Sequence, residues 1–155
     1  MGLKQKFAAG VACLTVLATT PAAHAAAHGH AAAEMVRKLD IMLMVSSLRC
    51  RKTSDSFQAE YQNFSARHLH ELNAASDELK SDLAQRYGQK GAVRALDRMS
   101  VRMANQYGQG HPWLDCHQLK KVTGDLADNR EPGALLAAAE KLLDEGGRVN
   151  LQASY

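Results

Sequence analysis

The amino-acid sequence predicts an all-α protein: an up-down-up-down four-helix bundle with a short fifth helix and one disulfide. Apolar residues recur every three or four positions along the chain, without the sustained alternation that strands show. Glycine, proline and polar breaks divide these runs, and short connections make consecutive helices antiparallel neighbours. This topology also brings Cys50, after the first helix, and Cys116, at the start of the fourth, to one end of the bundle.

The N-terminal segment predicts export. Lys4 and Lys6 precede an uncharged run of 14 residues, 7–20, and the sequence Ala-His-Ala then offers a small-x-small cleavage site ending at Ala25. This order is typical of a secretory signal peptide, whereas a membrane-spanning helix needs about 20 apolar residues. We therefore expect residues 1–25 to be removed and no transmembrane segment to remain.

Processing would leave a single helical domain, residues 26–155, with a flexible arm at 26–31 and a loose tail at 148–155. The full chain has 19 basic and 16 acidic side chains, and loss of the two leader lysines leaves 17 basic ones. This near balance gives no indication of the net positive potential by which proteins attract nucleic acids. The expected location is the periplasm or the extracellular space, with an unknown protein or ligand there as the partner.

Export determines how the cysteines are interpreted. Removal of the leader takes away Cys13 and leaves Cys50 and Cys116, which are expected to pair in an oxidising compartment. The alternatives are a catalytic thiol or a metal site. Cys116 and His117 are neighbours on a predicted helix and so do not face each other, and the chain has no CxxC or CxxCH spacing.

The first two predicted helices have the longest apolar faces. Residues 32–49 form the first, and its methionines are interpreted as core residues rather than copper or haem ligands. The second runs from Phe57 to Tyr87, either unbroken or interrupted near residues 73–76. Its face is built from Phe57, Tyr61, Phe64, His68, Leu72, Ala75, Leu79 and Leu83. His68 is interpreted as a hydrogen-bonded histidine at the edge of the core, with a haem ligand as the alternative.

Three shorter helices follow. They begin near Val93, Trp113 and Gly133, and the last is rich in alanine. The tripeptide Tyr-Gly-Gln occurs twice, and both of its glycines, Gly88 and Gly108, are predicted to be left-handed C-caps, a conformation that glycine adopts without steric cost.

One helix face is a candidate for binding an anionic partner. Arg94, Arg98 and Arg102 follow one another at intervals of four residues on the third predicted helix, with Asp97 as the nearby acid. A protein or phospholipid with negative charge could lie against this stripe. The alternative is an ordinary solvated helix face.

The chain offers little that indicates catalysis. It has no GxSxG, HExxH or P-loop motif, and its paired carboxylates, such as Asp77 with Glu78, fall at exposed helix positions. We therefore predict no catalytic residue and expect no cofactor. A small hydrolase is kept as the last alternative function.

The expected new N-terminus is a candidate metal site. Cleavage after Ala25 would expose Ala26, Ala27 and His28, with His30 close behind. A free amine, two backbone amides and an imidazole at the third position can surround one ion in a square plane, a geometry suited to Cu(II) or Ni(II). Copper or nickel binding in the periplasm is therefore the alternative function.

Several short features resemble those of small secreted bacterial helical proteins of unknown function. They are Arg-Cys-Arg after the first helix, Tyr-x-x-Phe in the second, the two Tyr-Gly-Gln stops and Asp-Cys before the fourth, and they span most of the exported chain. The leading expectation is an exported, disulfide-stapled bundle that acts as a non-catalytic binding or accessory protein.

Overall fold

The computed structural model describes the backbone of residues 22–143 and the side chains of residues 29–143. This part of the chain contains no strand and has five helices: α1 (Ala22–Cys50), α2 (Gln58–Arg67), α3 (Leu69–Tyr107), α4 (Cys116–Asp128) and α5 (Ala134–Leu143). The predicted all-α class is confirmed. Most of the signal peptide and the whole predicted tail lie outside the described residues. Within residues 22–143, none of the helices combines the length and the hydropathy that crossing a bilayer requires.

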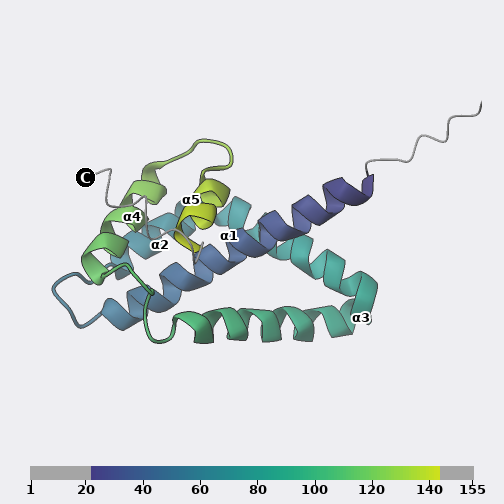
Figure 1. Ribbon diagram of the computed structural model, residues 1–155, viewed down its shortest axis with the longest axis horizontal. Coiled ribbons are helices and arrows are strands. Elements are labelled where there is room, and N and C mark those ends of the chain that lie inside the picture. Colours follow the sequence, from purple (N-terminus) through teal and green to yellow (C-terminus); the bar gives the residue numbers. More distant parts are fainter. Residues whose placement is uncertain (1–21, 144–155) are drawn as a thin grey trace, which may run out of the picture.

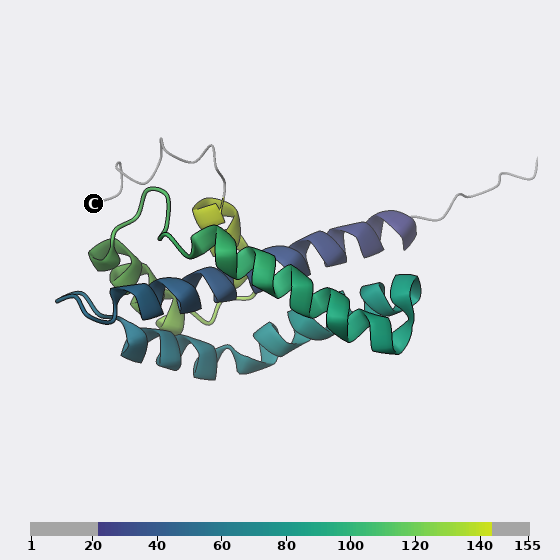
Figure 2. The same cartoon turned by 90° about the horizontal axis from the view of Figure 1, so that it is seen from below.

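The chain reverses direction from one long segment to the next (Figures 1 and 2). α2 and the first arm of α3 run back along α1, and the chain turns at Gly88. The second arm of α3 then returns towards the end of the molecule that carries Cys50. α4 begins there and leads into α5, and both short helices lie on this half only. The other half consists of the N-terminal part of α1 and the two arms of α3.

α1 is the central helix and packs against α3 on one side and α5 on another. Leu39, Met42 and Leu43 are completely buried, which confirms the core interpretation for that methionine. α1 begins well before the predicted start near residue 32, and the arm predicted at residues 26–31 is helical. The segment is rich in alanine, the best helix former, so the helix extends back through it.

The disulfide is confirmed. Cys50 and Cys116 are bonded, with their Cα atoms 5.8 Å apart. The bond joins the last residue of α1 to the first residue of α4. A capping box starts α4: Asp115 accepts a hydrogen bond from the backbone N–H of Gln118, whose side chain accepts one from the backbone N–H of Asp115. With both sulfurs paired, the alternative of a catalytic thiol is wrong.

The second predicted helix is broken, at a place the sequence did not indicate. α2 ends at Arg67 and α3 begins at Leu69, with His68 in a non-helical conformation between them (φ −105°, ψ 15°). The His68 ring is buried, and its Nε2 lies 2.8 Å from the carbonyl oxygen of Leu126 in α4. The bend lets α2 lie along α4 while the apolar face continues into α3.

The two glycine caps depart from the prediction in different ways. Gly88 has a positive φ of 67° and interrupts α3, so the chain reverses there, but its ψ of 169° is not the left-handed helical conformation that was predicted. Gly108 is right-handed, with φ −60° and ψ −26°. The left-handed residue after the second arm is Gly110, with φ 105°. The two Tyr-Gly-Gln tripeptides therefore end their helices differently.

Candidate functional site

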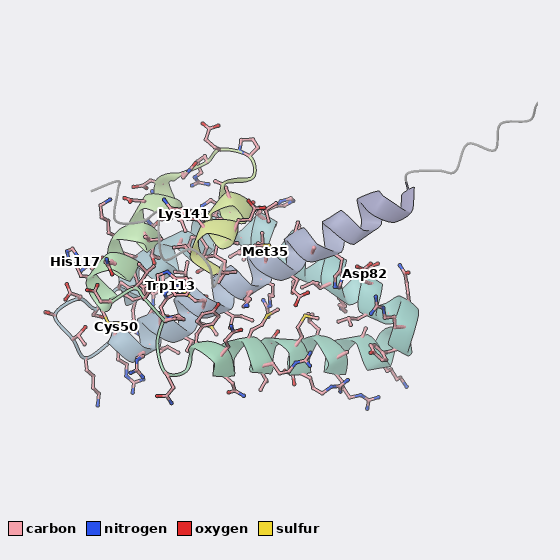
Figure 3. All side chains as sticks on the ribbon, viewed as in Figure 1. Met35, Cys50, Asp82, Trp113, His117 and Lys141 are labelled. Atoms are coloured by element: carbon pink, nitrogen blue, oxygen red, sulfur yellow. A yellow bond between two sulfur atoms is a disulfide. The ribbon has the colours of Figure 1, made fainter. Side chains whose placement is uncertain are left out.

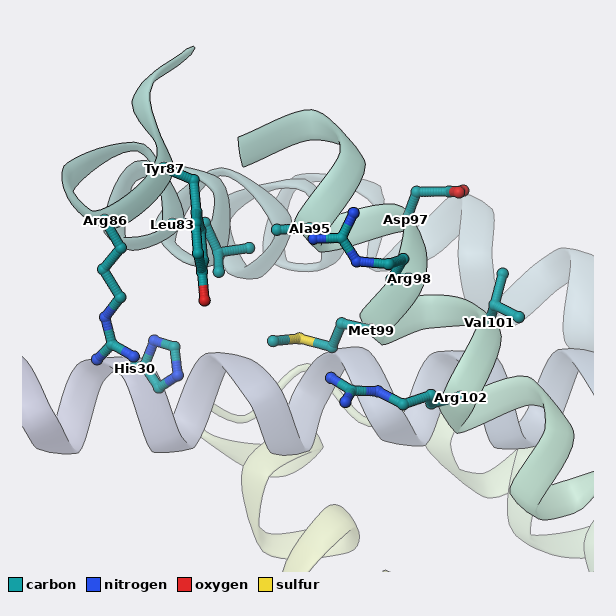
Figure 4. A pocket seen from close by; sticks show the side chains of 10 residues that line it. All are labelled: His30, Leu83, Arg86, Tyr87, Ala95, Asp97, Arg98, Met99, Val101 and Arg102. Carbon is teal, nitrogen blue, oxygen red and sulfur yellow. The ribbon is translucent and has the colours of Figure 1, made fainter. Parts of the chain in front are cut away.

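A cleft of about 560 Å³ lies in the half of the molecule opposite the disulfide, between α1 and the two arms of α3 (Figure 4). Figure 3 places Cys50 near one end of the protein and Asp82, next to the cleft, in the other half. Four nitrogen-bearing side chains line the cleft: His30 from α1, Arg86 from the first arm of α3, and Arg98 and Arg102 from the second arm.

The sharp corner of α3 creates this cleft. Gly88 turns the chain, and Gly91 comes so close to Tyr87 that a Cβ added at position 91 would lie 2.7 Å from the Tyr87 Cβ. A small separate cluster of buried apolar residues supports the corner from within, formed by Leu83, Ala92 and Ala95. Leu83 and Ala95 also line the cleft, together with Met99, and these residues contribute its apolar part.

The three arginines of the cleft are exposed, and none has an ion-pair or hydrogen-bond partner among residues 29–143. The remaining charged residue of the lining, Asp97, points away from the cleft in Figure 4. Guanidinium groups that share a concave surface and form no ion pair raise the positive potential there. The cleft is therefore suited to an anion.

His30 is held in place by acidic neighbours. Its Nδ1 lies 2.7 Å from Oδ2 of Asp82, and its Nε2 lies 3.8 Å from Oε2 of Glu34. Because an ionised carboxylate can only accept a hydrogen bond, Nδ1 carries the proton and donates it. Asp82 thereby fixes the orientation of the imidazole at the edge of the cleft.

The predicted arginine stripe is divided by the geometry of its helix. Arg98 and Arg102 line the cleft, whereas Arg94 is exposed outside it. A step of four residues turns a helix by about 40° beyond a full circle, so Arg94 is rotated by about 80° from Arg102.

Sequence reasoning missed Arg86 and His30 as parts of this site, because they come from other segments. The reversal predicted at Gly88 was the signal that could have placed Arg86 near the second arm.

The other predicted residues lie elsewhere. Ala26, Ala27 and His28 belong to the α1 backbone, but their side chains are outside the described part, so the copper or nickel site stays a prediction. His68 is a buried histidine with a hydrogen-bond partner, as interpreted from the sequence. His117 is exposed at the start of α4. Among the residues described, no group of three or more His, Cys, Asp or Glu side chains could hold a metal ion.

A second polar cluster ties three helices together in the middle of the molecule. The Tyr61 hydroxyl donates to Asp40 at 3.0 Å, Arg37 lies 3.7 Å from the same carboxylate, and Arg37 also donates to the Ser100 hydroxyl at 3.3 Å. Burial raises the pKa of Asp40, and the Tyr61 hydrogen bond and the Arg37 charge oppose this shift. Burial, together with the Asp40 carboxylate, raises the pKa of Tyr61. These contacts join α1, α2 and α3, and we interpret the cluster as structural.

Comparison with protein-family models, curated proteins and solved structures finds no match for this chain. Function is therefore argued from the chemistry of the basic cleft.

Proposed function

We propose that this protein is an exported, disulfide-stapled helical bundle that binds a small anionic ligand in its basic cleft and does not catalyse a reaction. One observation carries the proposal: Arg86, Arg98 and Arg102, from two arms of α3, meet at one cleft without partners among the described residues. The guanidinium group presents several donors in a planar fork that matches carboxylate and phosphate oxygens.

The composition of the cleft supports binding rather than catalysis. Its described lining contains no serine, threonine or cysteine that could act as a nucleophile, and the Nδ1 proton of His30 is engaged by Asp82. The volume is within the range of pockets that hold small molecules. The disulfide is the kind of bond that persists in oxidising compartments, which supports export.

The proposal is tested by measuring how anions change the melting temperature. Citrate and phosphate are added at constant ionic strength to the exported protein and to the double variant Arg98→Gln/Arg102→Gln. We expect stabilisation of the wild type, because a ligand that binds only the folded state raises its stability, and we expect the double variant to lose this response.

Arg94→Gln is the control for loss of charge on this helix, because it removes one arginine that lies outside the cleft. It should respond to anions as the wild type does. An equal response in all three proteins would mean that the anions act through general screening, and would contradict the proposal.

Mass spectrometry of the periplasmic fraction tests export, because the mature chain should begin at Ala26.

A second function is favoured by the sequence at that new N-terminus. After cleavage, Ala26, Ala27 and His28 would begin α1, and the first amides of a helix have no acceptor within it. They are thus available to a Cu(II) ion together with the free amine and the imidazole. Copper titration of the mature protein against His28→Ala tests this alternative. Equal affinity in the two proteins would rule it out.

A further inference from the structure

The nitrogen-bearing side chains of the cleft are gathered at two ends (Figure 4). Arg86 and His30 lie towards one end, and Arg98 and Arg102 extend into the other. Leu83, Ala95 and Met99 lie between them. A single anionic group can therefore contact one end of the cleft but leaves the other end without a counter-charge.

The surface between the two ends is apolar. Leu83 and Ala95 are each 8% exposed, and Met99 is partly buried against the core. The phenol of Tyr87 extends towards the same space (Figure 4), from a residue that is 57% exposed. A hydrocarbon segment over Leu83, Ala95 and Met99 would gain from this apolar contact, and the Tyr87 hydroxyl is the one polar group that extends from the labelled side chains into the same space.

The two ends differ in charge. Arg98 and Arg102 are one helical turn apart, so both guanidinium groups can reach the same carboxylate or phosphate. At the opposite end, Arg86 is accompanied by His30, whose neighbours Asp82 and Glu34 are acidic. The Arg98 end should therefore bind an anionic group more tightly than the Arg86 end.

We propose that the ligand of this cleft is an elongated dianion, in which two acidic groups, carboxylate or phosphate, are joined by a short apolar spacer. Arg98 and Arg102 bind one acidic group, Arg86 binds the other, and the spacer lies over Leu83, Ala95 and Met99. This inference rests on the proposed anion-binding function and adds the shape and class of the ligand.

Isothermal titration calorimetry with straight-chain dicarboxylates, from succinate to dodecanedioate, tests the shape. Affinity should pass through a maximum at one chain length, where both acidic groups reach arginine. The monocarboxylate of that same length should bind about tenfold more weakly or worse, because it forgoes the charge-assisted contacts at one end. The corresponding alkane bisphosphonates, measured in the same way, decide between carboxylate and phosphate as the preferred group.

Variants locate the two ends. Arg86→Gln should reduce the affinity of the best diacid to about that of its monoacid, and Arg98→Gln/Arg102→Gln should weaken both ligands. Arg94→Gln is again the control and should bind as the wild type does. Circular dichroism confirms that each variant is folded.

The outcomes separate this inference from the function on which it rests. If the wild type binds monoacid and diacid equally, with no dependence on chain length, the two-ended ligand is wrong and anion binding stands. If no anion binds at the cleft, both proposals fail. If affinity passes through a maximum with chain length, and Arg86→Gln abolishes that maximum, the result supports both anion binding and the two-ended ligand.

Discussion

At the scale of single residues, His111 shows how one imidazole can hold a loop in place. Its Nδ1 accepts the backbone N–H groups of Leu114 at 3.2 Å and Trp113 at 3.4 Å. Nε2 must therefore carry the proton, which it donates to the carbonyl oxygen of Leu142 in α5 at 3.0 Å. This pattern requires a neutral ring, and burial lowers the pKa of His111. This contact joins positions 31 residues apart, so the local pattern of the sequence gives no sign of it.

His111 should make stability depend on pH. Because its pKa is lower in the folded than in the unfolded state, the unfolded chain binds the proton more readily. The contribution is fully present above the ordinary histidine pKa of about 6.5 and is lost as the pH falls through the lower, folded value. Melting temperatures between about pH 7.5 and pH 5 should therefore fall more steeply for the wild type than for His111→Asn, which cannot take up the proton. If the melting temperatures of the wild type and of His111→Asn fell in parallel with pH, His111 would not be the source of this pH dependence.

At the scale of elements, the positions of helix breaks show what the sequence could and could not supply. The apolar face from Phe57 to Leu83 continues through the break at His68, so spacing alone does not reveal it. The break accompanies a hydrogen bond to Leu126, which is 58 residues away. Gly88 could be placed because a glycine interrupts an otherwise regular pattern. The same argument failed at Gly108, because Gly110 takes the left-handed position two residues later.

Replacement of Gly88 tests the corner of α3 directly. Gly88 has a φ of 67°, and an added Cβ would meet nothing within 4 Å. Its ψ of 169° places it in a region that is essentially restricted to glycine, so Gly88→Ala should lower the free energy of unfolding by about 1–3 kcal/mol through backbone strain alone. Gly124→Ala is the opposite control: it is within α4, also has open space, and should gain up to about 1 kcal/mol from helix propensity. Urea denaturation measures both values, and a loss of stability in both variants would show that the corner is not a special site.

At the scale of the whole molecule, the two halves are built differently. The half with the disulfide contains α4, α5 and the buried rings of Phe57 and Phe64, whereas in the described part of the chain the cleft half has only α1 and the arms of α3. The topology was enough to predict that Cys50 and Cys116 would meet, because that requires only the direction of each helix. Predicting the cleft would require the rotation of three helical segments about their own axes, and apolar spacing does not define these rotations. The stripe of arginines was therefore found, but the cleft was not.

Removal of the disulfide should affect the two halves unequally. The bond spans 66 positions of sequence, and closing a loop of this size in the unfolded chain is worth about 4 kcal/mol in the chain-entropy model. The variant Cys50→Ser/Cys116→Ser, which leaves no free thiol in the exported chain, should therefore melt at a markedly lower temperature. Because the bond attaches α4 directly to α1, hydrogen exchange should accelerate first in α4 and α5. The corner of α3 and its response to anions should change much less, since the cleft is built without α4 or α5. Uniform acceleration across all five described helices would instead show that the molecule opens as one cooperative unit.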